Sequence, residues 1–231
     1  MFGKSQCTQT DDVRLMFRNM FKSLPVCHIY TAEIPDGEIT ADMLDKIYPE
    51  ARKKEIAACS NAQLIRQKYY AWKLLEYALL NSFGYNISRL ELNKSANGKW
   101  TSPACCFSIS HSGDAVAVAL SRDSIGVDVQ LPETPHPITG LNKKILTFAE
   151  SKQYEALPDC ERNQYVMTKW TQKESIFKTF DEPCFRPSKI NVADYPVNTR
   201  RVLIGDKEYI LSVTNRHIDE LKYYHKSITE V

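Results

Sequence analysis

The hydrophobic positions of the first half of the chain change period along the sequence. Residues 26–34 have a strand-like pattern, whereas residues 41–83 follow helical spacing and predict two helices separated near Ser60. The second helix carries one apolar stripe, formed by Leu64, Ala71, Leu75 and Ala78. Lys68 lies roughly 40° from Leu64 around this helix and therefore borders the apolar face. Gly84 follows as a predicted C-cap.

Strand patterns return in the middle of the chain. Residues 107–120 alternate around a turn at Ser112, Gly113 and Asp114, which predicts a hairpin with valines and leucine on one face and alanines on the other. A short strand is expected at residues 125–129. Three prolines within residues 132–137 then indicate a linker.

The second half repeats the order of helices followed by strands. Thr147 and Glu150 form a capping-box signature, and a longer helix is expected at about residues 162–180. A Gly205-Asp206 turn then predicts a second hairpin. We therefore expect an α+β protein with two lobes and a cleft between them. The expected parts are an N-terminal extension (1–25), an N-terminal lobe (26–124) and a C-terminal lobe (125–231).

Composition narrows the classes of function. The 231 residues have a formal net charge of +2 with acids and bases interspersed, which argues against a nucleic-acid-binding protein. Seven cysteines without zinc-ligand spacing favour reduced thiols and a cytoplasmic protein. Residues 1–25 hold no continuous apolar run, so we expect neither a signal peptide nor a membrane span. A monomer is expected because the two lobes supply the cleft internally.

An acidic residue interrupts the apolar strand predicted at residues 125–129. Asp128 and Gln130 point to the same face of this strand because side chains alternate with a period of two. A carboxylate buried without a partner is costly, and a bound cation would remove that cost. The alternative is an aspartate that caps the following helix or pairs with a neighbouring arginine.

The long helix of the second half carries a second carboxylate. Glu174 lies about 40° from the apolar Trp170 around the helix, and Lys178 follows one turn later. A surface ion pair at i,i+4 spacing would explain these two residues alone. Together with Asp128, however, Glu174 offers the pair of carboxylates that a phosphate-bound magnesium ion commonly takes.

The hairpin turn brings hydroxyl and imidazole groups together. Ser110, His111 and the turn amides near Gly113 form a reasonable phosphate cradle. A histidine at a hairpin turn is also often solvated or hydrogen-bonded for structural reasons. Taken alone, the motif leaves both interpretations open.

These three segments, in this order, resemble the 4′-phosphopantetheinyl transferases of the surfactin-synthetase-activating type. The family pattern Phe-Asn-Ile-Ser-His-Ser-Gly is met by residues 107–113, and Ile-Gly-hydrophobic-Asp-hydrophobic-Glu by residues 125–130. The pattern Trp-Ser-x-Lys-Glu-Ser/Ala-x-x-Lys is met by residues 170–178, and 46 residues separate Asp128 from Glu174. The helical region at residues 51–83 is similar to the first lobe of the family.

The resemblance implies a Mg²⁺-dependent holo-[acyl-carrier-protein] synthase. It would transfer the 4′-phosphopantetheine group of coenzyme A to a serine of an apo acyl or peptidyl carrier protein and release adenosine 3′,5′-bisphosphate. It also implies two lobes related by a pseudo-twofold axis with coenzyme A in the cleft. Asp128 and Glu174 would hold the metal, and Lys178 would contact the coenzyme A pyrophosphate.

The remaining roles that the resemblance implies concern the nucleotide and the carrier serine. Ser110, His111 and Lys68 would meet the 3′-phosphate, with Lys68 standing where the family usually has an arginine. Lys99 corresponds to the lysine of a Gly-Lys-Pro element, although Trp100 replaces the proline. Glu150 aligns with a glutamate proposed as the general base. Its capping-box position offers an equally good structural explanation.

One residue departs from the family pattern at the expected metal site. Gln130 stands where the family most often has a glutamate as the third metal ligand. A glutamine can offer its amide oxygen but removes one negative charge, which favours weaker metal binding. A second interpretation is therefore a catalytically silent coenzyme A- or nucleotide-binding module with a regulatory role.

Overall fold

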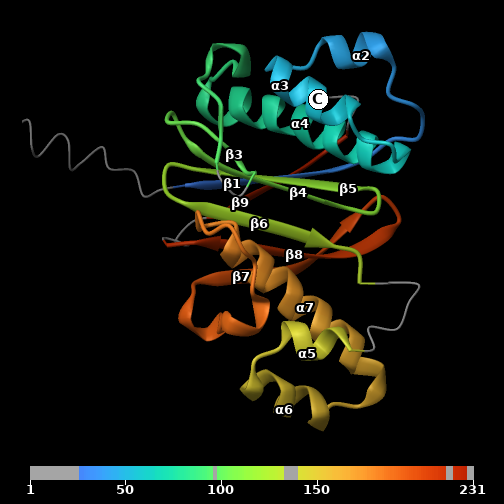
Figure 1. Cartoon of the computed structure of the whole chain (residues 1–231), viewed down its shortest axis with the longest axis vertical. Helices are drawn as coiled ribbons and strands as arrows, with labels where there is room; N and C mark the ends of the chain where they lie inside the picture. The colour runs from blue at the N-terminus through green and yellow to red at the C-terminus, as the bar shows by residue number, and fades with distance from the viewer. Residues whose placement is uncertain (1–25, 96–97, 133–139, 217–220, 228–231) are drawn as a thin grey trace, which may run out of the picture.

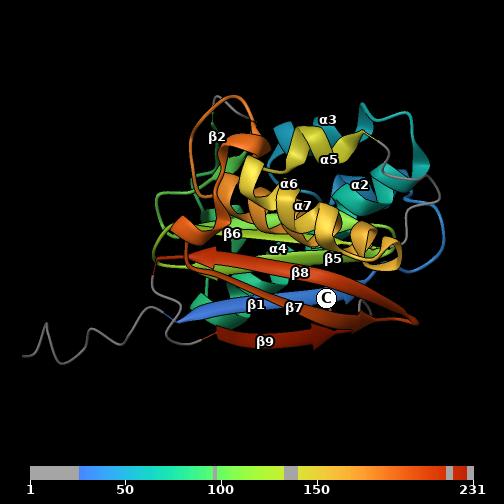
Figure 2. The same ribbon diagram turned by 90° about the horizontal axis from the view of Figure 1, so that it is seen from below.

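Two β-sheets lie face to face between two groups of helices in the computed structural model (Figure 1). The structure describes residues 26–95, 98–132, 140–216 and 221–227. The expected extension at residues 1–25 and residues 133–137 of the expected linker lie outside these ranges. Helices α2 to α4 cover the first sheet, and α5 to α7 cover the second (Figures 1 and 2). The mixture of helices and several sheets agrees with the expected α+β class.

The first half begins with strand β1 (Cys27–Glu33), as predicted. Residues 41–83 form three helices instead of the expected two: α2 (Ala41–Asp45), α3 (Glu50–Ala57) and α4 (Ala62–Phe83). The extra boundary precedes Pro49, which disfavours helical backbone at Tyr48. The predicted break near Ser60 is confirmed, because the Asn61 side chain caps α4 by accepting a bond from the Leu64 amide at 2.9 Å. Gly84 ends α4 with φ of 68°, as expected of a C-cap.

The first sheet has the order β4-β5-β1-β9. The predicted hairpin is confirmed by β4 (Cys106–Ser112) and β5 (Ala115–Ser121), which pair in antiparallel register. Strand β9 (Leu221–Lys226) pairs with β1 in parallel, so the end of the chain completes the sheet of the first half. The sheets therefore cross the boundary expected between residues 124 and 125. Between α4 and β4 lie the short η1 (Ile87–Arg89), β2 (Asn93–Lys94) and β3 (Trp100–Thr101).

Strand β5 is buried on both faces. Val116, Val118 and Leu120 pack into the core beneath α4. Ala115, Ala117 and Ala119 face the core between the sheets, which includes Val127, Leu211 and Val213. The predicted division of this strand is thus confirmed. The small alanine side chains allow the second sheet to approach closely.

The second sheet has the order β6-β8-β7 and is antiparallel. It comprises β6 (Ile125–Gln130), β7 (Val197–Ile204) and β8 (Lys207–Asn215). The helices of this half are α5 (Leu141–Ile145), α6 (Phe148–Ala156) and α7 (Asp159–Phe177), followed by η2 (Pro187–Lys189) and η3 (Val192–Asp194). The predicted strand, capping box and hairpin are confirmed, but α7 begins and ends about three residues before its predicted limits.

Helix α7 lies very close to β6. A Cβ atom added to Gly126 would lie 1.8 Å from the carbonyl oxygen of Ser175, so only glycine fits at this position. This contact brings the C-terminal end of α7 beside the strand that carries Asp128. The positions of Glu174 and Lys178 relative to Asp128 depend on it.

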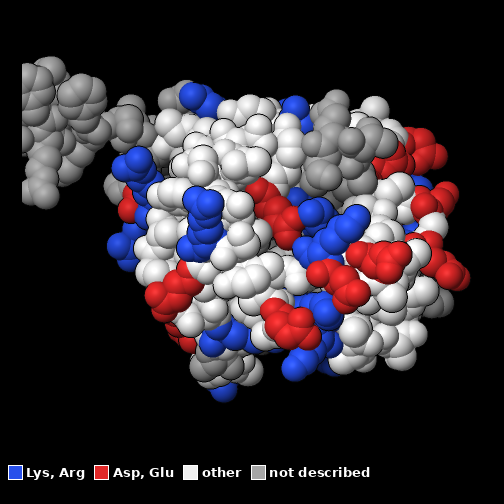
Figure 3. All heavy atoms as spheres, turned by 90° about the horizontal axis from the view of Figure 1, so that it is seen from above, with Lys and Arg blue, Asp and Glu red and all other residues white. Residues whose placement is uncertain are grey.

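On the face that α2 and α3 share, Lys and Arg side chains lie among Asp and Glu (Figure 3). None of the helices in the described ranges combines the length and apolar character needed to cross a membrane.

Candidate functional site

Three serines of β4 bind backbone amides of β6 and of Leu131, the residue that follows it, and hold the two sheets together. Their hydroxyl oxygens accept hydrogen bonds from alternate amides: Val127 to Ser108 at 3.0 Å, Val129 to Ser110 at 3.2 Å, and Leu131 to Ser112 at 3.1 Å. These amides lie on the edge of the second sheet, where a strand partner is missing. The serines therefore satisfy backbone groups that would otherwise be buried without hydrogen bonds.

Asp128 is 2% exposed and is surrounded by donors. Its Oδ1 accepts hydrogen bonds from Ser110 Oγ at 2.7 Å and from Lys178 Nζ at 2.7 Å. Its Oδ2 accepts one from Gln130 Nε2 at 3.1 Å. The buried carboxylate thus pairs with a lysine of α7, whereas the sequence had suggested an arginine or a helix cap as alternatives to a metal.

Lys178 is the C-cap residue of α7 and connects this helix to β6. Besides Asp128, its ammonium group donates to the backbone oxygen of Val127 at 2.9 Å. Its ion pair in the described part of the chain is with Asp128, not with Glu174. The i,i+4 surface pair considered from the sequence is therefore not what the structure contains.

Glu174 supplies a second carboxylate close to Asp128. Burial raises the pKa of Glu174, Lys178 acts to lower it, and the negative charge of Asp128 raises it further. Its side chain makes no hydrogen bond to the residues that the structure describes. A cation placed beside both carboxylates would offset the burial and the repulsion that raise this pKa.

Gln130 completes the donor set expected for the metal. Its Oε1 accepts from Ser112 Oγ at 3.3 Å, while its nitrogen faces Asp128. Exchange of the amide oxygen and nitrogen by rotation would present an oxygen instead. The described residues contain no cluster of three His, Cys, Asp or Glu side chains suited to a metal. Two carboxylates and an amide oxygen nevertheless fit Mg²⁺, which keeps water and phosphate ligands.

A cavity of about 330 Å³ lies between the two halves of the molecule. Glu174 and Lys178 line it from the second half, and Lys68 and His111 from the first. Lys99 also lines it and donates to the backbone oxygen of Lys178 at 2.5 Å. The structure thus brings together, around one cavity, most of the residues singled out from the sequence.

Positive charge collects at the His111 end of this cavity. Burial, followed by the charges of Lys178, Arg52 and Lys68, lowers the pKa of His111 to about 4. The imidazole is therefore neutral at pH 7 and lies among cationic side chains. Burial also lowers the pKa of Lys99. An anionic group is the ligand that this charge distribution favours.

Ser110 does not share the cavity with His111. It is 5% exposed and points from β4 toward β6, because successive side chains of a strand face opposite sides. Ser110 is therefore not among the residues that line the cavity. Its hydroxyl holds Asp128 and one amide of β6.

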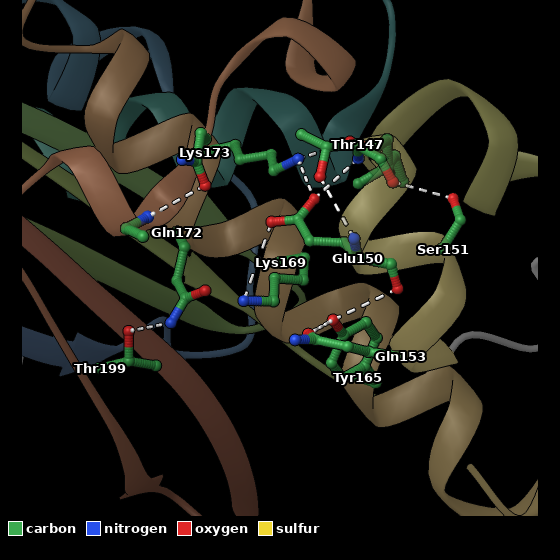
Figure 4. A network of polar contacts seen from close by, with 12 residues as sticks. Thr147, Glu150, Ser151, Gln153, Tyr165, Lys169, Gln172, Lys173 and Thr199 are labelled. Carbon is green, nitrogen blue, oxygen red and sulfur yellow. Dashed lines mark hydrogen bonds and ion pairs between the residues drawn. The ribbon is translucent and has the colours of Figure 1, made fainter. Parts of the chain in front are cut away.

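Glu150 lies in a separate polar network (Figure 4). It completes the capping box with Thr147, whose amide donates to Oε2 at 2.8 Å. The same oxygen binds Lys173 Nζ at 2.6 Å, and Lys169 Nζ lies 3.8 Å from Oε1. Lys173 is fully buried and also donates to the Ile145 oxygen at 2.8 Å. The structural role is confirmed, and Glu150 is not among the residues lining the cavity.

The sequence did not point to three other residues of the cavity: Arg52, Glu55 and Trp100. The i,i+3 spacing of Arg52 and Glu55 was visible, but such a pair is typical of an exposed helix face. Only the packing of α3 against α4 and β3 places them inside the cavity. No local pattern of the sequence could have separated them from surface residues.

Comparison with known proteins found a family model that matches the second half of the chain. Residues 124–226 match the family model described as the 4′-phosphopantetheinyl transferase superfamily. A search of curated proteins found no match. The matched region carries Asp128, Glu174 and Lys178, whereas Lys68 and His111 lie outside it. The part of the chain that supplies the carboxylate end of the cavity is therefore similar to the 4′-phosphopantetheinyl transferase superfamily.

Proposed function

We propose that this protein transfers the 4′-phosphopantetheine group of coenzyme A to a serine of an apo acyl or peptidyl carrier protein. The observation that carries the proposal is that the buried Asp128 binds Lys178 and lies close to Glu174, two residues that line the cavity, within the region that matches the superfamily. In this role the protein is a holo-[acyl-carrier-protein] synthase. Its partners are coenzyme A and the carrier protein.

Mg²⁺ is the metal assigned in this proposal. Asp128 and Glu174 would hold it, with the amide oxygen of Gln130 as a third ligand. When bound, the ion would neutralise negative charge on the pyrophosphate oxygens of coenzyme A. The support is the chemistry of the donors, namely two acidic oxygen ligands close to a cavity that favours anions.

The cationic end of the cavity is assigned to the nucleotide. His111 and Lys68 would bind the 3′-phosphate, and Arg52 adds positive charge beside them. Lys178 would contact the pyrophosphate from the end of α7. Lys99 would reach the same phosphates after releasing the Lys178 backbone oxygen that it binds. Ser110 is assigned to positioning Asp128 and not to the phosphate.

The proposed reaction forms one bond and breaks one bond at phosphorus. The oxygen of the carrier serine attacks the phosphorus that bears the pantetheine arm, and adenosine 3′,5′-bisphosphate leaves with the electrons of the broken P–O bond. Lys178 would stabilise charge on the phosphate oxygens. The resemblance assigns the serine proton to Glu150, but Glu150 binds Lys173. That assignment stays a prediction.

We also propose an architecture, an oligomeric state and a cellular location for the protein. Residues 26–124 and 125–231 would be two lobes related by a pseudo-twofold axis, acting as a cytoplasmic monomer. The support is that each half places a long helix, α4 or α7, over antiparallel strands. The cavity lies where residues from both halves meet.

The test is intact-mass measurement of purified apo carrier proteins incubated with the protein, coenzyme A and Mg²⁺. We expect a gain of one phosphopantetheine group on at least one carrier. Asp128→Ala should abolish the gain, whereas Asp123→Ala, which removes an exposed carboxylate before β6, should not. No gain on any carrier in a panel of fatty-acid, polyketide and nonribosomal-peptide carriers would contradict the proposal.

A silent coenzyme A-binding module is the second candidate. The observation in its favour is the amide nitrogen of Gln130, which faces Asp128 where the family usually has a carboxylate. Binding of coenzyme A without transfer to any carrier would support this candidate. Restoring transfer with Gln130→Glu would then identify the missing ligand.

A further inference from the structure

A carboxylate lies among the cations at the nucleotide end of the cavity. Glu55 on α3 has a side chain that is 25% exposed and lines the cavity beside Arg52 and Lys68. Nothing in the proposed reaction uses this residue. A negative charge at this point is unexpected, because the same end of the cavity is assigned to a phosphate.

Glu55 binds four donors with its two oxygens. Oε1 accepts from Arg52 at 2.9 Å and lies 3.6 Å from Lys68 Nζ. Oε2 accepts from Trp100 Nε1 at 3.0 Å and from Lys94 at 3.1 Å. The carboxylate therefore occupies a set of cationic and N–H donors of the kind that also binds a phosphate group.

Glu55 is charged at neutral pH. Burial acts to raise its pKa, but Arg52, Trp100 and Lys94 outweigh burial, so the pKa lies below its ordinary value. Its negative charge offsets one of the three positive charges of Arg52, Lys68 and Lys94. An incoming phosphate meets a weaker positive potential than these cations alone would produce.

Arg52 does not depend on Glu55 for its position. Its second guanidinium nitrogen donates to the backbone oxygen of Lys68 at 2.9 Å, and the guanidinium lies 4.8 Å from the centre of the Trp72 ring. The side chain is also buried in the first half of the molecule. Neutralising Glu55 should therefore change the charge at this end of the cavity more than its geometry.

We propose that Glu55 is a specificity-determining residue that weakens binding of the 3′-phosphate. Its carboxylate competes with that phosphate for Lys68 and repels it, so the protein discriminates less strongly between adenine nucleotides with and without a 3′-phosphate. The inference rests on the proposed function, because it takes the nucleotide end of the cavity from it. Glu55 is then a residue of the site whose negative charge lowers the affinity for the phosphate.

The test compares two nucleotides that differ by one phosphate. Isothermal titration calorimetry would measure the Kd of adenosine 3′,5′-bisphosphate and of adenosine 5′-monophosphate, and their ratio gives the contribution of the 3′-phosphate. Glu55→Gln keeps the side-chain size and an oxygen acceptor for Arg52 or Trp100. We expect it to increase the preference for the bisphosphate about tenfold, the effect of one charge within about 10 Å at an effective dielectric of about 20.

Two further variants separate charge from geometry. Glu50→Gln removes the same charge from an exposed side chain on the same helix and should leave the ratio unchanged. Glu55→Asp keeps the charge on a shorter side chain, and its ratio should stay nearer to the wild-type value than that of Glu55→Gln. Thermal melting of each variant would show that it folds.

The outcomes distinguish this inference from the proposed function. If the wild type binds the nucleotides but Glu55→Gln leaves the preference unchanged or lowers it, Glu55 does not oppose the phosphate and the inference alone fails. An equal increase in Glu55→Asp would also overturn it, since the charge would not be the cause. If the wild type binds neither nucleotide nor coenzyme A at millimolar concentration, the proposed function fails and this inference falls with it.

Discussion

The ammonium group of Lys178 lies 2.7 Å from Asp128 Oδ1, so the end of α7 is joined by an ion pair to the middle of β6. Lys178 and Glu174 line the cavity, whereas Asp128 is buried and acts on Glu174 through its negative charge, which raises the pKa of that carboxyl. The single charge of Lys178 therefore pairs with Asp128 and offsets only part of the effect that raises the pKa of Glu174. The same amine can contact a phosphate that binds there.

Replacing Lys178 with methionine should remove both the ion pair with Asp128 and the cation that can contact a bound phosphate. We expect Lys178→Met to lower the rate of phosphopantetheine transfer at least about 100-fold, because a cation that stabilises the reacting phosphate is lost. The pKa of Glu174 should also rise further. The rate is measured by mass spectrometry of the carrier. Lys54→Met, at an exposed position on α3, is the matched control and should retain the wild-type rate.

Replacing Gln130 with glutamate should make stability depend on the metal. The variant loses the hydrogen bond to Asp128 and places a second carboxylate at the same point. Without Mg²⁺ we expect a loss of about 1–2 kcal/mol in the free energy of unfolding. Mg²⁺ should raise the melting temperature of Gln130→Glu more than that of the wild type, since it binds the folded state more tightly.

The control for this prediction is Gln164→Glu, at an exposed position on α7. It adds the same charge without approaching Asp128. If Mg²⁺ shifts the melting temperature of Gln130→Glu no more than that of this control, Gln130 is not beside a metal site.

Replacing Glu150 with glutamine should destabilise the fold. The fully buried Lys173 would lose its counter-ion, and we expect the free energy of unfolding to fall by about 3 kcal/mol in urea titration. Glu155→Gln, on the exposed face of the same helix, should have little effect. Removing the lysine as well, in Glu150→Gln/Lys173→Met, should recover part of the loss.

The same variant tests the role of Glu150 as a base. Transfer by Glu150→Gln is measured at a temperature where the protein is fully folded. A rate near that of the wild type would limit Glu150 to its structural role. A fall of about 100-fold in the folded protein would support the role of general base.

Replacing Gly126 with alanine should disturb the contact between β6 and α7. The new Cβ would lie 1.8 Å from the Ser175 oxygen, which the backbone can avoid only by moving the helix. We expect a loss of at least about 3 kcal/mol in the free energy of unfolding. Gly84→Ala has open space and φ of 68°, so its expected loss is only about 1 kcal/mol. Equal losses in the two variants would contradict the close contact.

The low pKa of His111 predicts a loss of stability in acid. The imidazole has a pKa of about 4 in the folded protein and an ordinary value of 6.5, so between these pH values the unfolded chain binds more protons. The free energy of unfolding should therefore fall as the pH is lowered from 6.5 toward 4. The contribution is at most about 3.5 kcal/mol, because the two pKa values differ by about 2.5 and each pKa unit corresponds to about 1.4 kcal/mol.

The measurement is the difference in unfolding free energy between the wild type and His111→Gln over this pH range. Because the variant lacks the imidazole, the free energy of unfolding of the wild type should fall relative to that of His111→Gln as the pH is lowered from 6.5 toward 4. NMR titration of the imidazole should also show that adenosine 3′,5′-bisphosphate raises the pKa of His111, because a bound anion offsets the neighbouring cations. A pKa near 6.5 in the free protein would contradict the cationic environment.

Features that depend only on residues close together in the sequence were predicted from the sequence alone. The hairpin that ends at β5, the C-cap at Gly84 and the capping box of Thr147 follow from local periodicity and local backbone conformation. Asp128 stood out for the same reason, since a carboxylate in an apolar strand needs a partner whatever the fold. The resemblance supplied the pairing of this residue with Glu174.

Only the tertiary structure decided which distant groups meet. The pairing of β9 with β1, the burial of Ser110 against Asp128 and the presence of Glu55 in the cavity depend on how the sheets and helices pack. Each of these residues has an ordinary local pattern that an exposed strand or helix would also show. Their roles arise because packing brings together groups far apart in the sequence, and burial there determines which charges and hydrogen bonds must be satisfied.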